Sequence, residues 1–189
     1  MKGILTSMLV VVMMVLVSCR GGSNGKDSAD VAEDQNEKML SSQLDDDAEF
    51  AVDAADGGLL EIELGRLAEG SAASPEVKAF GRMMAEDHGK ASTQLKRIAE
   101  QANIVLPQVM SRDNQRKYDK LKGKSGADFD KAYMDMMVEE HRDDVEDFEE
   151  QAREGRIEVL KQWASTNVPV LQQHLQEAER LRESVRSKR

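Results

Sequence analysis

The chain has 189 residues, with 26 Lys and Arg against 36 Asp and Glu, which gives a formal net charge of -10 with neutral histidines. Nucleic-acid binding needs a basic face, so this charge balance excludes nucleic acid as a partner. The length suits a single domain. Aromatic residues make up 4% of the chain and it contains only 3 Pro, which favours helices over a β-sandwich. A single cysteine excludes an internal disulfide framework and a cysteine-rich zinc site.

The first residues resemble the leader of a bacterial lipoprotein. Lys2 is followed by a mostly apolar stretch, residues 4–17, which is shorter than the roughly 20 residues that a membrane-spanning helix needs. The stretch ends in Leu16-Val17-Ser18-Cys19, and this run resembles the lipobox, in which small residues precede a cysteine that becomes lipidated. We therefore predict a signal peptide over residues 1–18 and lipid attachment at Cys19. An ordinary secretory signal is the alternative.

Residues 19–44 are rich in Gly, Ser, Asp, Asn and Gln and show little periodicity, so they predict a disordered tether. Arg20 follows the cysteine, where an Asp would be the usual cue for retention in the inner membrane. We therefore expect a lipid anchor in the outer membrane, with the protein facing the periplasm. The predicted partners are the membrane and an envelope protein, and the oligomeric state is left open.

Helical periodicity begins at residue 45, where apolar residues start to recur at steps of three and four. Residues 45–186 thus predict an all-α, four-helix bundle domain. Gly57-Gly58 interrupts the first helix and predicts close helix packing or a local bend. The expected long helices span about 45–69, 75–103, 127–154 and 156–185, with a short helical piece at about 112–122.

The chain has only three histidines, and each lies in the apolar stripe of a different predicted helix: His88, His141 and His174. Roughly a third to a half of helix positions face a core, so three inward placements are unlikely to arise by chance. A long crossover over residues 104–126 would make the second and third helices parallel. All three histidines would then lie in one layer, at depths of roughly 18 to 21 Å. The sequence therefore predicts a ferritin-like bundle with a crossover between helices 2 and 3.

The first helix has no histidine and should supply a carboxylate to this layer. Depth along the helix favours Asp56, with Glu61 and Glu63 within a turn or two. Asp87 adjoins His88 and could orient a neighbouring imidazole. Three imidazoles and a carboxylate suit Zn(II), Cu(II) or Fe(II). The alternative is a metal-free structural or protein-binding module whose histidines hydrogen-bond one another and nearby acids.

Enzymatic motifs are missing from the chain, and we predict no catalytic residue. Di-iron carboxylate bundles use Glu-x-x-His, but the residues three positions before the histidines are Ala85, Val138 and Leu171. A ferritin-type ferroxidase is therefore disfavoured. There is no P-loop and no dinucleotide-binding fingerprint. The acidic run between Glu139 and Glu150 is interpreted as a solvated face.

Four segments together resemble a known bacterial family, domain of unknown function 4142, whose members are described as exported or outer-membrane proteins with a ferritin-like bundle. The segments are Gly57 to Ala68, Ser74 to His88, Phe129 to His141 and Pro169 to Leu175. The resemblance implies that Glu61, rather than Asp56, is the acid of the first helix. It also implies that seven residues belong to the family pattern, namely Glu61, Asp87, His88, Asp130, Tyr133, His141 and His174. Together these observations predict an envelope lipoprotein that binds a metal in its bundle core, for metal buffering or stress protection.

Overall fold

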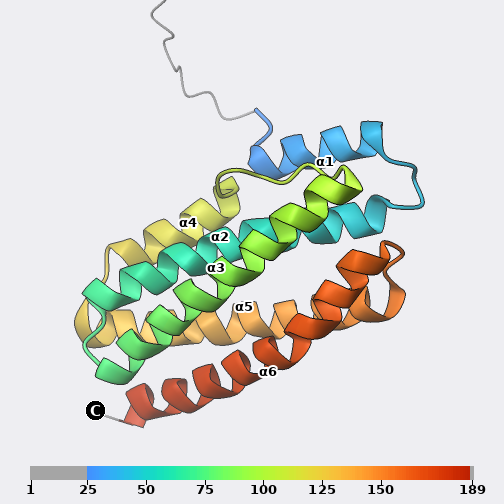
Figure 1. Ribbon diagram of the computed structural model, residues 1–189. Coiled ribbons are helices and arrows are strands. Elements are labelled where there is room, and N and C mark those ends of the chain that lie inside the picture. The colour runs from blue at the N-terminus through green and yellow to red at the C-terminus, as the bar shows by residue number, and fades with distance from the viewer. Residues whose placement is uncertain (1–24, 188–189) are drawn as a thin grey trace, which may run out of the picture.

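The protein is described by a computed structural model over residues 25–187, and this range folds into six helices without a β-strand (Figure 1). The predicted signal peptide and Cys19 lie outside the described residues. None of the helices within 25–187 is both long and apolar enough to cross a bilayer. The helices are α1 (Ser28–Met39), α2 (Asp45–Ser71), α3 (Pro75–Ala102), α4 (Arg112–Lys122), α5 (Gly126–Glu154) and α6 (Glu158–Ser187).

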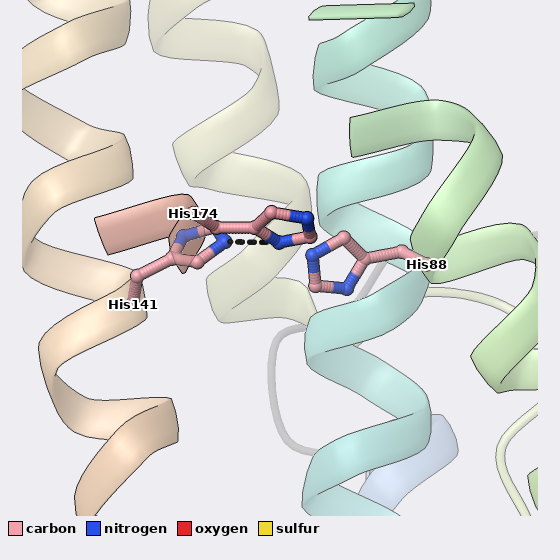
Figure 2. Close-up of side chains that lie close together, drawn as sticks. All are labelled: His88, His141 and His174. Carbon is pink, nitrogen blue, oxygen red and sulfur yellow. Dashed lines mark hydrogen bonds between the residues drawn. The ribbon is translucent and has the colours of Figure 1, made fainter. Parts of the chain in front are cut away.

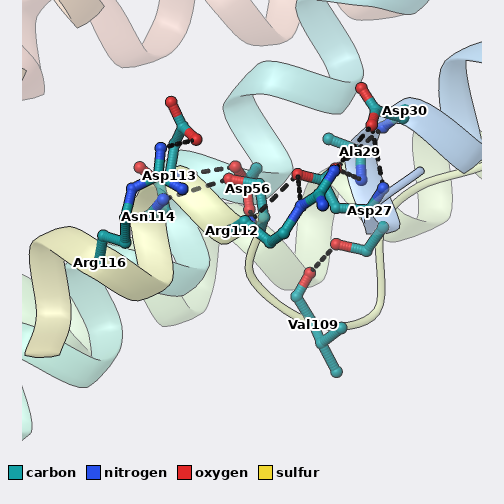
Figure 3. Close-up of polar contacts among 11 residues, drawn as sticks. Asp27, Ala29, Asp30, Asp56, Val109, Arg112, Asp113, Asn114 and Arg116 are labelled. Carbon is teal, nitrogen blue, oxygen red and sulfur yellow. Dashed lines mark hydrogen bonds and ion pairs between the residues drawn. The ribbon is translucent and has the colours of Figure 1, made fainter. Parts of the chain in front are cut away.

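The prediction of a disordered tether over residues 19–44 is wrong for its second half, where α1 forms. Asp27 caps this helix by accepting the backbone N–H groups of residues 29 and 30. The buried side chain of Asn36 then pairs with both backbone groups of Val105, at 2.7 and 3.0 Å. Asp27 also accepts the backbone N–H of Arg112 (Figure 3). These contacts with residues far along the chain hold α1 against the rest of the bundle.

The four long helices are those that the sequence predicts, and they pack as two antiparallel hairpins, α2 with α3 and α5 with α6. Both α3 and α5 start at the same end of the bundle, because Ala72 pairs with Gly126 and because Asp130 accepts the N–H groups of Ala73 and Ser74. The connection over residues 103–125, which contains α4, therefore runs back along the bundle (Figure 1). This confirms an all-α fold with the predicted crossover, while the ferritin-like designation stays a prediction.

Helices α2 and α3 approach each other closely at Gly65 on α2 and Gly81 on α3. A Cβ atom added to Gly65 would lie 2.5 Å from the carbonyl oxygen of Gly81, and one added to Gly81 would lie 2.8 Å from that of Gly65. The expectation of close helix packing at Gly57-Gly58 is wrong, while a local bend stays a prediction. A Cβ atom at either position would meet nothing within 4 Å, and α2 continues through both residues.

Buried carboxylates tie the helices together at their ends. Three aspartates on α2 and α5 accept hydrogen bonds at the start of a helix other than their own, where backbone N–H groups lack partners within the helix. They are Asp130 with Ala73 and Ser74 before α3, Asp47 with Arg156 and Ile157 before α6, and Asp56 with Ser111 and Asn114 at α4 (Figure 3). Each contact joins residues more than 50 positions apart in the chain.

The apolar core consists of two clusters along the bundle. One lies towards the α2–α3 turn and includes Phe80, Tyr133 and Leu181. The other lies towards the opposite end and includes Leu95 and Trp163. On α3, α5 and α6, the histidines fall between the members of the first cluster and those of the second. A polar layer therefore divides the core.

Candidate metal centre

The three histidines converge from α3, α5 and α6 at the middle of the bundle (Figure 2). Their ring centroids lie 5.4 to 5.5 Å apart in all three pairs. One ring nitrogen of each lies within 4.8 Å of the corresponding nitrogens of the other two. His141 is fully buried, and His88 and His174 are 8% and 3% exposed. The prediction of a single histidine layer is confirmed.

His141 and His174 face each other through nitrogens that carry no proton. The Nδ1 atom of His141 lies 3.0 Å from the carbonyl oxygen of Met137, which can only accept, so Nδ1 holds the proton. The Nε2 atom of His174 faces the carboxylate of Asp87 at 3.4 Å, which places the proton of that ring on Nε2. The remaining nitrogens, Nε2 of His141 and Nδ1 of His174, are 3.4 Å apart (Figure 2). Two lone pairs therefore point at each other in a buried place.

The third ring, His88, also presents a free nitrogen. Its Nδ1 atom lies 2.7 Å from Oε2 of Glu61. Its Nε2 atom is buried and has no hydrogen-bond partner among the described residues. Figure 2 shows a nitrogen of this ring turned towards His141 and His174. Each histidine thus has one nitrogen held by an oxygen and a second nitrogen free.

Glu61 comes from α2, the one long helix without a histidine, and it is 3% exposed. Its Oε1 atom lies 3.3 Å from Nδ1 of His141, and its Oε2 atom binds Nδ1 of His88. In His88 and His141 the Nε2 atom is turned towards the other histidines. Glu61 therefore contacts the Nδ1 atoms, which lie on the outer side of these two rings. In this arrangement the carboxylate orients two imidazoles from outside the layer.

Two of the acids that the sequence associates with the layer lie elsewhere. Asp56 binds Ser111 and Asn114 at the start of α4. Glu63 pairs with Arg66 on the surface. By contrast, Asp87 orients the imidazole of His174, in the role that its position beside His88 predicts.

Asp144 belongs to the centre, although its position in the acidic run between Glu139 and Glu150 predicts a solvated face. It lies three residues after His141 on α5 and therefore on the same side of that helix. Its carboxylate forms an alternative donor set with Glu61 and His141. Its Oδ2 atom is buried without a hydrogen-bond partner among residues 25–187. Helical spacing from His141 is the signal that could have identified it.

Burial keeps the groups of the centre uncharged. Desolvation lowers the pKa of His88, and desolvation together with the two neighbouring rings holds the pKa of His141 well below its ordinary value. Desolvation and the proximity of His88 lower the pKa of His174 to about 4. Desolvation and nearby Glu140 raise the pKa of Glu61 to about 8. The close contact of Glu61 with His88 is therefore a hydrogen bond between neutral groups at pH 7, and the imidazoles are in the form that binds metals.

The methionines near the histidines belong to the apolar core. Met84 and Met137 are fully buried within the cluster that contains Phe80 and Tyr133. Met83 and Met136 pack against the same cluster. These thioethers therefore have an apolar environment of their own, and the donor atoms at the centre are imidazole nitrogens and carboxylate oxygens.

Comparisons with known proteins identify a family and a related fold. The chain matches the family described as "Domain of unknown function (DUF4142)" over residues 29–181. Among solved structures it is similar to a DUF305 protein from Streptomyces coelicolor that is inferred to be secreted. That match has a TM-score of 0.63 and 18% sequence identity, and it covers 74% of this chain and 93% of the other. A comparison with the curated proteins finds no match.

Proposed function

The chain belongs to the DUF4142 family, and we propose that its bundle domain binds one divalent transition-metal ion between His88, His141 and His174. The observation that carries this proposal is the 3.4 Å approach of Nε2 of His141 to Nδ1 of His174 in a buried layer, where the outer contacts of both rings assign the proton to the other nitrogen. Two facing lone pairs repel each other, and a cation between them removes that repulsion.

The spacing of the nitrogens suits a metal. Zinc–nitrogen bonds of about 2.0 to 2.1 Å in a tetrahedral arrangement place neighbouring ligand atoms about 3.3 Å apart. Nε2 of His141 and Nδ1 of His174 are 3.4 Å apart. Three imidazoles suit Zn(II), Cu(II) or Fe(II), and they leave a fourth position for an exogenous ligand.

The outer contacts complete the expected surroundings of such a site. Metal-binding histidines usually donate their second N–H to a carbonyl or a carboxylate, which fixes the ring. The three acceptors are the carbonyl oxygen of Met137 for His141, Asp87 for His174 and Glu61 for His88. In this proposal Glu61, the fourth ligand that the sequence predicts, has its main role in fixing His88 and His141.

We place the protein in the bacterial cell envelope, anchored by a lipid on Cys19 and facing the periplasm. Two observations support this location: the lipobox-like run at residues 16–19, and the fold that the chain shares with a protein inferred to be secreted. In the envelope, a buried site of this kind would serve to buffer a metal or to protect against metal stress. The membrane, through the lipid, and an envelope protein are the proposed partners.

Metal titration tests the proposal. The purified protein, stripped with a chelator, should bind one equivalent of Zn(II) or Co(II), and the substitution His141→Gln should abolish this binding. Gln has nearly the length of His, and circular dichroism would confirm that the variant is folded. Stoichiometric binding that survives His141→Gln would contradict the site.

A metal-free module is the alternative function, and one observation favours it. Each histidine already has a hydrogen-bond partner, so the layer could fix the register of the bundle without an ion. A ligand that binds only the folded state raises the melting temperature. If a specific metal binds, stoichiometric Zn(II) should raise the melting temperature and a chelator should reverse the change. An unchanged melting temperature would favour the metal-free module.

A further inference from the structure

A small cavity adjoins the histidine layer. Its volume is about 40 Å³, and its polar lining includes two histidines and three acids, namely His88, His174, Asp87, Glu61 and Asp144. Apolar side chains form most of the rest, among them Leu95, Phe148, Trp163 and Leu171. A water molecule needs a cavity of about 10 to 15 Å³ on the same measure, so this space admits a ligand of only a few non-hydrogen atoms.

Gly58 lines the cavity and leaves open space where a side chain would begin. This residue is buried, yet a Cβ atom added there would meet nothing within 4 Å. A glycine in a helix interior costs about 1 kcal/mol relative to alanine, and an unfilled cavity is destabilising as well. A larger residue at this position would both raise helix propensity and reduce the space beside the histidines.

Four buried polar atoms of the cavity-lining residues lack hydrogen-bond partners among the described residues: Nε1 of Trp163, Nε2 of His88, Oε1 of Glu61 and Oδ2 of Asp144. Trp163 is 7% exposed, and its Nε1–H group is buried without an acceptor among the described residues. The Nε2 atom of His88 is likewise unpartnered. A buried donor without an acceptor costs about 1 to 3 kcal/mol. An occupant that accepts a hydrogen bond from Trp163 would remove that cost.

We propose that this cavity binds an exogenous ligand of two or three non-hydrogen atoms, with a lone pair at its end. The inference rests on the proposed metal site. One end of the ligand occupies the fourth coordination position beside His88 and His174, and the ligand accepts a hydrogen bond from Trp163. The size of the cavity excludes larger organic molecules, and its apolar walls favour a compact ligand over a hydrated one.

Azide binding to the Co(II)-loaded protein tests this inference. Azide has three atoms and terminal lone pairs, and its binding to Co(II) changes the visible absorption spectrum. Gly58→Val places a side chain in the cavity, and Gly57→Val is the matched control. A Cβ atom at Gly57 also meets nothing within 4 Å, but Gly57 does not line this cavity.

We expect azide to change the spectrum of the unchanged protein and of Gly57→Val with similar affinity. Gly58→Val should bind Co(II) with unchanged stoichiometry and bind azide at least tenfold more weakly. Gly58→Ala, which fills less of the space and is easier to accommodate, should give an intermediate loss. Equal azide affinity in Gly58→Val and Gly57→Val would overturn the inference, as would Co(II) binding without any response to azide.

The fluorescence of Trp163 gives a second readout that needs no metal, because this residue is the only tryptophan in the chain. Dioxygen, with two atoms, should quench the metal-free protein more than Gly58→Val, whereas acrylamide, which is too large, should quench both equally little. Equal dioxygen quenching in the two proteins would show that the cavity does not admit small molecules. Failure to bind Co(II) at all would overturn the proposed metal site, and with it the coordination of the ligand. Co(II) binding without an azide response would overturn the ligand inference alone.

Discussion

The Oε2 atom of Glu61 lies 2.7 Å from Nδ1 of His88, so one carboxyl group on α2 fixes an imidazole of the facing helix α3. Its other oxygen lies 3.3 Å from Nδ1 of His141. Glu61 thus contacts histidines from two different helices, and the first three predictions concern it.

Glu61→Gln should weaken metal binding by roughly 10- to 100-fold, the usual effect of losing a group that orients a metal ligand. The amide keeps the shape of the side chain but cannot ionise, and it presents one oxygen instead of two to the rings. A competition titration against a chromogenic chelator measures the loss. Glu63→Gln is the matched control, because Glu63 pairs with Arg66 on the surface, and it should bind like the unchanged protein. Equal affinities in the two variants would contradict the role assigned to Glu61.

Metal affinity should rise with pH up to about 8. Burial raises the pKa of Glu61 to about 8 in the metal-free protein, so its carboxyl group carries a proton at pH 7. When a metal binds Nε2 of His88, the N–H at Nδ1 forms a stronger hydrogen bond with an ionised carboxylate than with a neutral carboxyl group. Metal binding should therefore release the proton of Glu61. The affinity should therefore increase up to about tenfold per pH unit between about pH 6.5 and 8, and then level off. In Glu61→Gln this slope should disappear.

The stability of the metal-free protein should change with pH in the opposite direction. The pKa of Glu61 is raised from its ordinary 4.5 to about 8 on folding, so the folded state binds the proton more tightly than the unfolded chain. Stability from this group is complete below about pH 4.5 and is lost as the pH rises towards 8. The three histidines have lowered pKa values and contribute in the opposite direction below about pH 6.5, so the effect of Glu61 is isolated above that pH. The melting temperature of the metal-free protein should fall between about pH 6.5 and 8, and Glu61→Gln should flatten the decline. A melting temperature that rises between about pH 6.5 and 8, with the same slope in Glu61→Gln, would contradict the raised pKa.

Gly65→Ala should destabilise the bundle by about 1 to 3 kcal/mol, because the added methyl group would lie 2.5 Å from the carbonyl oxygen of Gly81 and force α2 and α3 apart. Gly70→Ala is the control on the same helix. A Cβ atom there meets nothing within 4 Å, so higher helix propensity should leave stability unchanged or raise it by up to about 1 kcal/mol. Urea denaturation of both variants gives the comparison, and equal midpoints would contradict the close approach.

Asn36→Ala should lower the free energy of unfolding by about 2 kcal/mol, because it removes a buried side chain and leaves both partly buried backbone groups of Val105 without their partner. Gln35→Ala removes a neighbouring exposed amide and should have little effect. Chemical denaturation measures both free energies of unfolding. Equal values for the two variants and the unchanged protein would show that α1 does not contribute to the stability of the fold.

Local signals in the sequence were sufficient for the long helices. Pro75 and Gly155, for example, mark a beginning and an end that the structure places within a residue or two of the expected positions. By contrast, α1 escapes this kind of analysis because its composition is polar. It is held by Asn36 and by Asp27, whose partners lie 69 and 85 residues away. Such partners are invisible to a pattern read along the chain.

The candidate centre was predictable where helical spacing and depth agree, which holds for all three histidines and for Asp87. Depth along the helix favours Asp56, but depth does not determine which face of the helix a side chain occupies. Five residues separate Asp56 from Glu61, and they rotate a side chain by roughly 140°. Asp144 was missed for the opposite reason: it lies within a run of acids in which most members are exposed, so composition concealed its orientation.

The three aspartates that hold the starts of other helices have a consequence for how the bundle opens. The first turn of a helix is usually where it frays, since its N–H groups lack partners. Here the starts of α3, α4 and α6 are each bound to a carboxylate on α5 or α2. Opening any of them requires breaking a contact with a helix distant in the chain. Local fluctuations are thereby coupled to unfolding of the whole bundle, and backbone amides at these helix starts should exchange with solvent as slowly as those of the core.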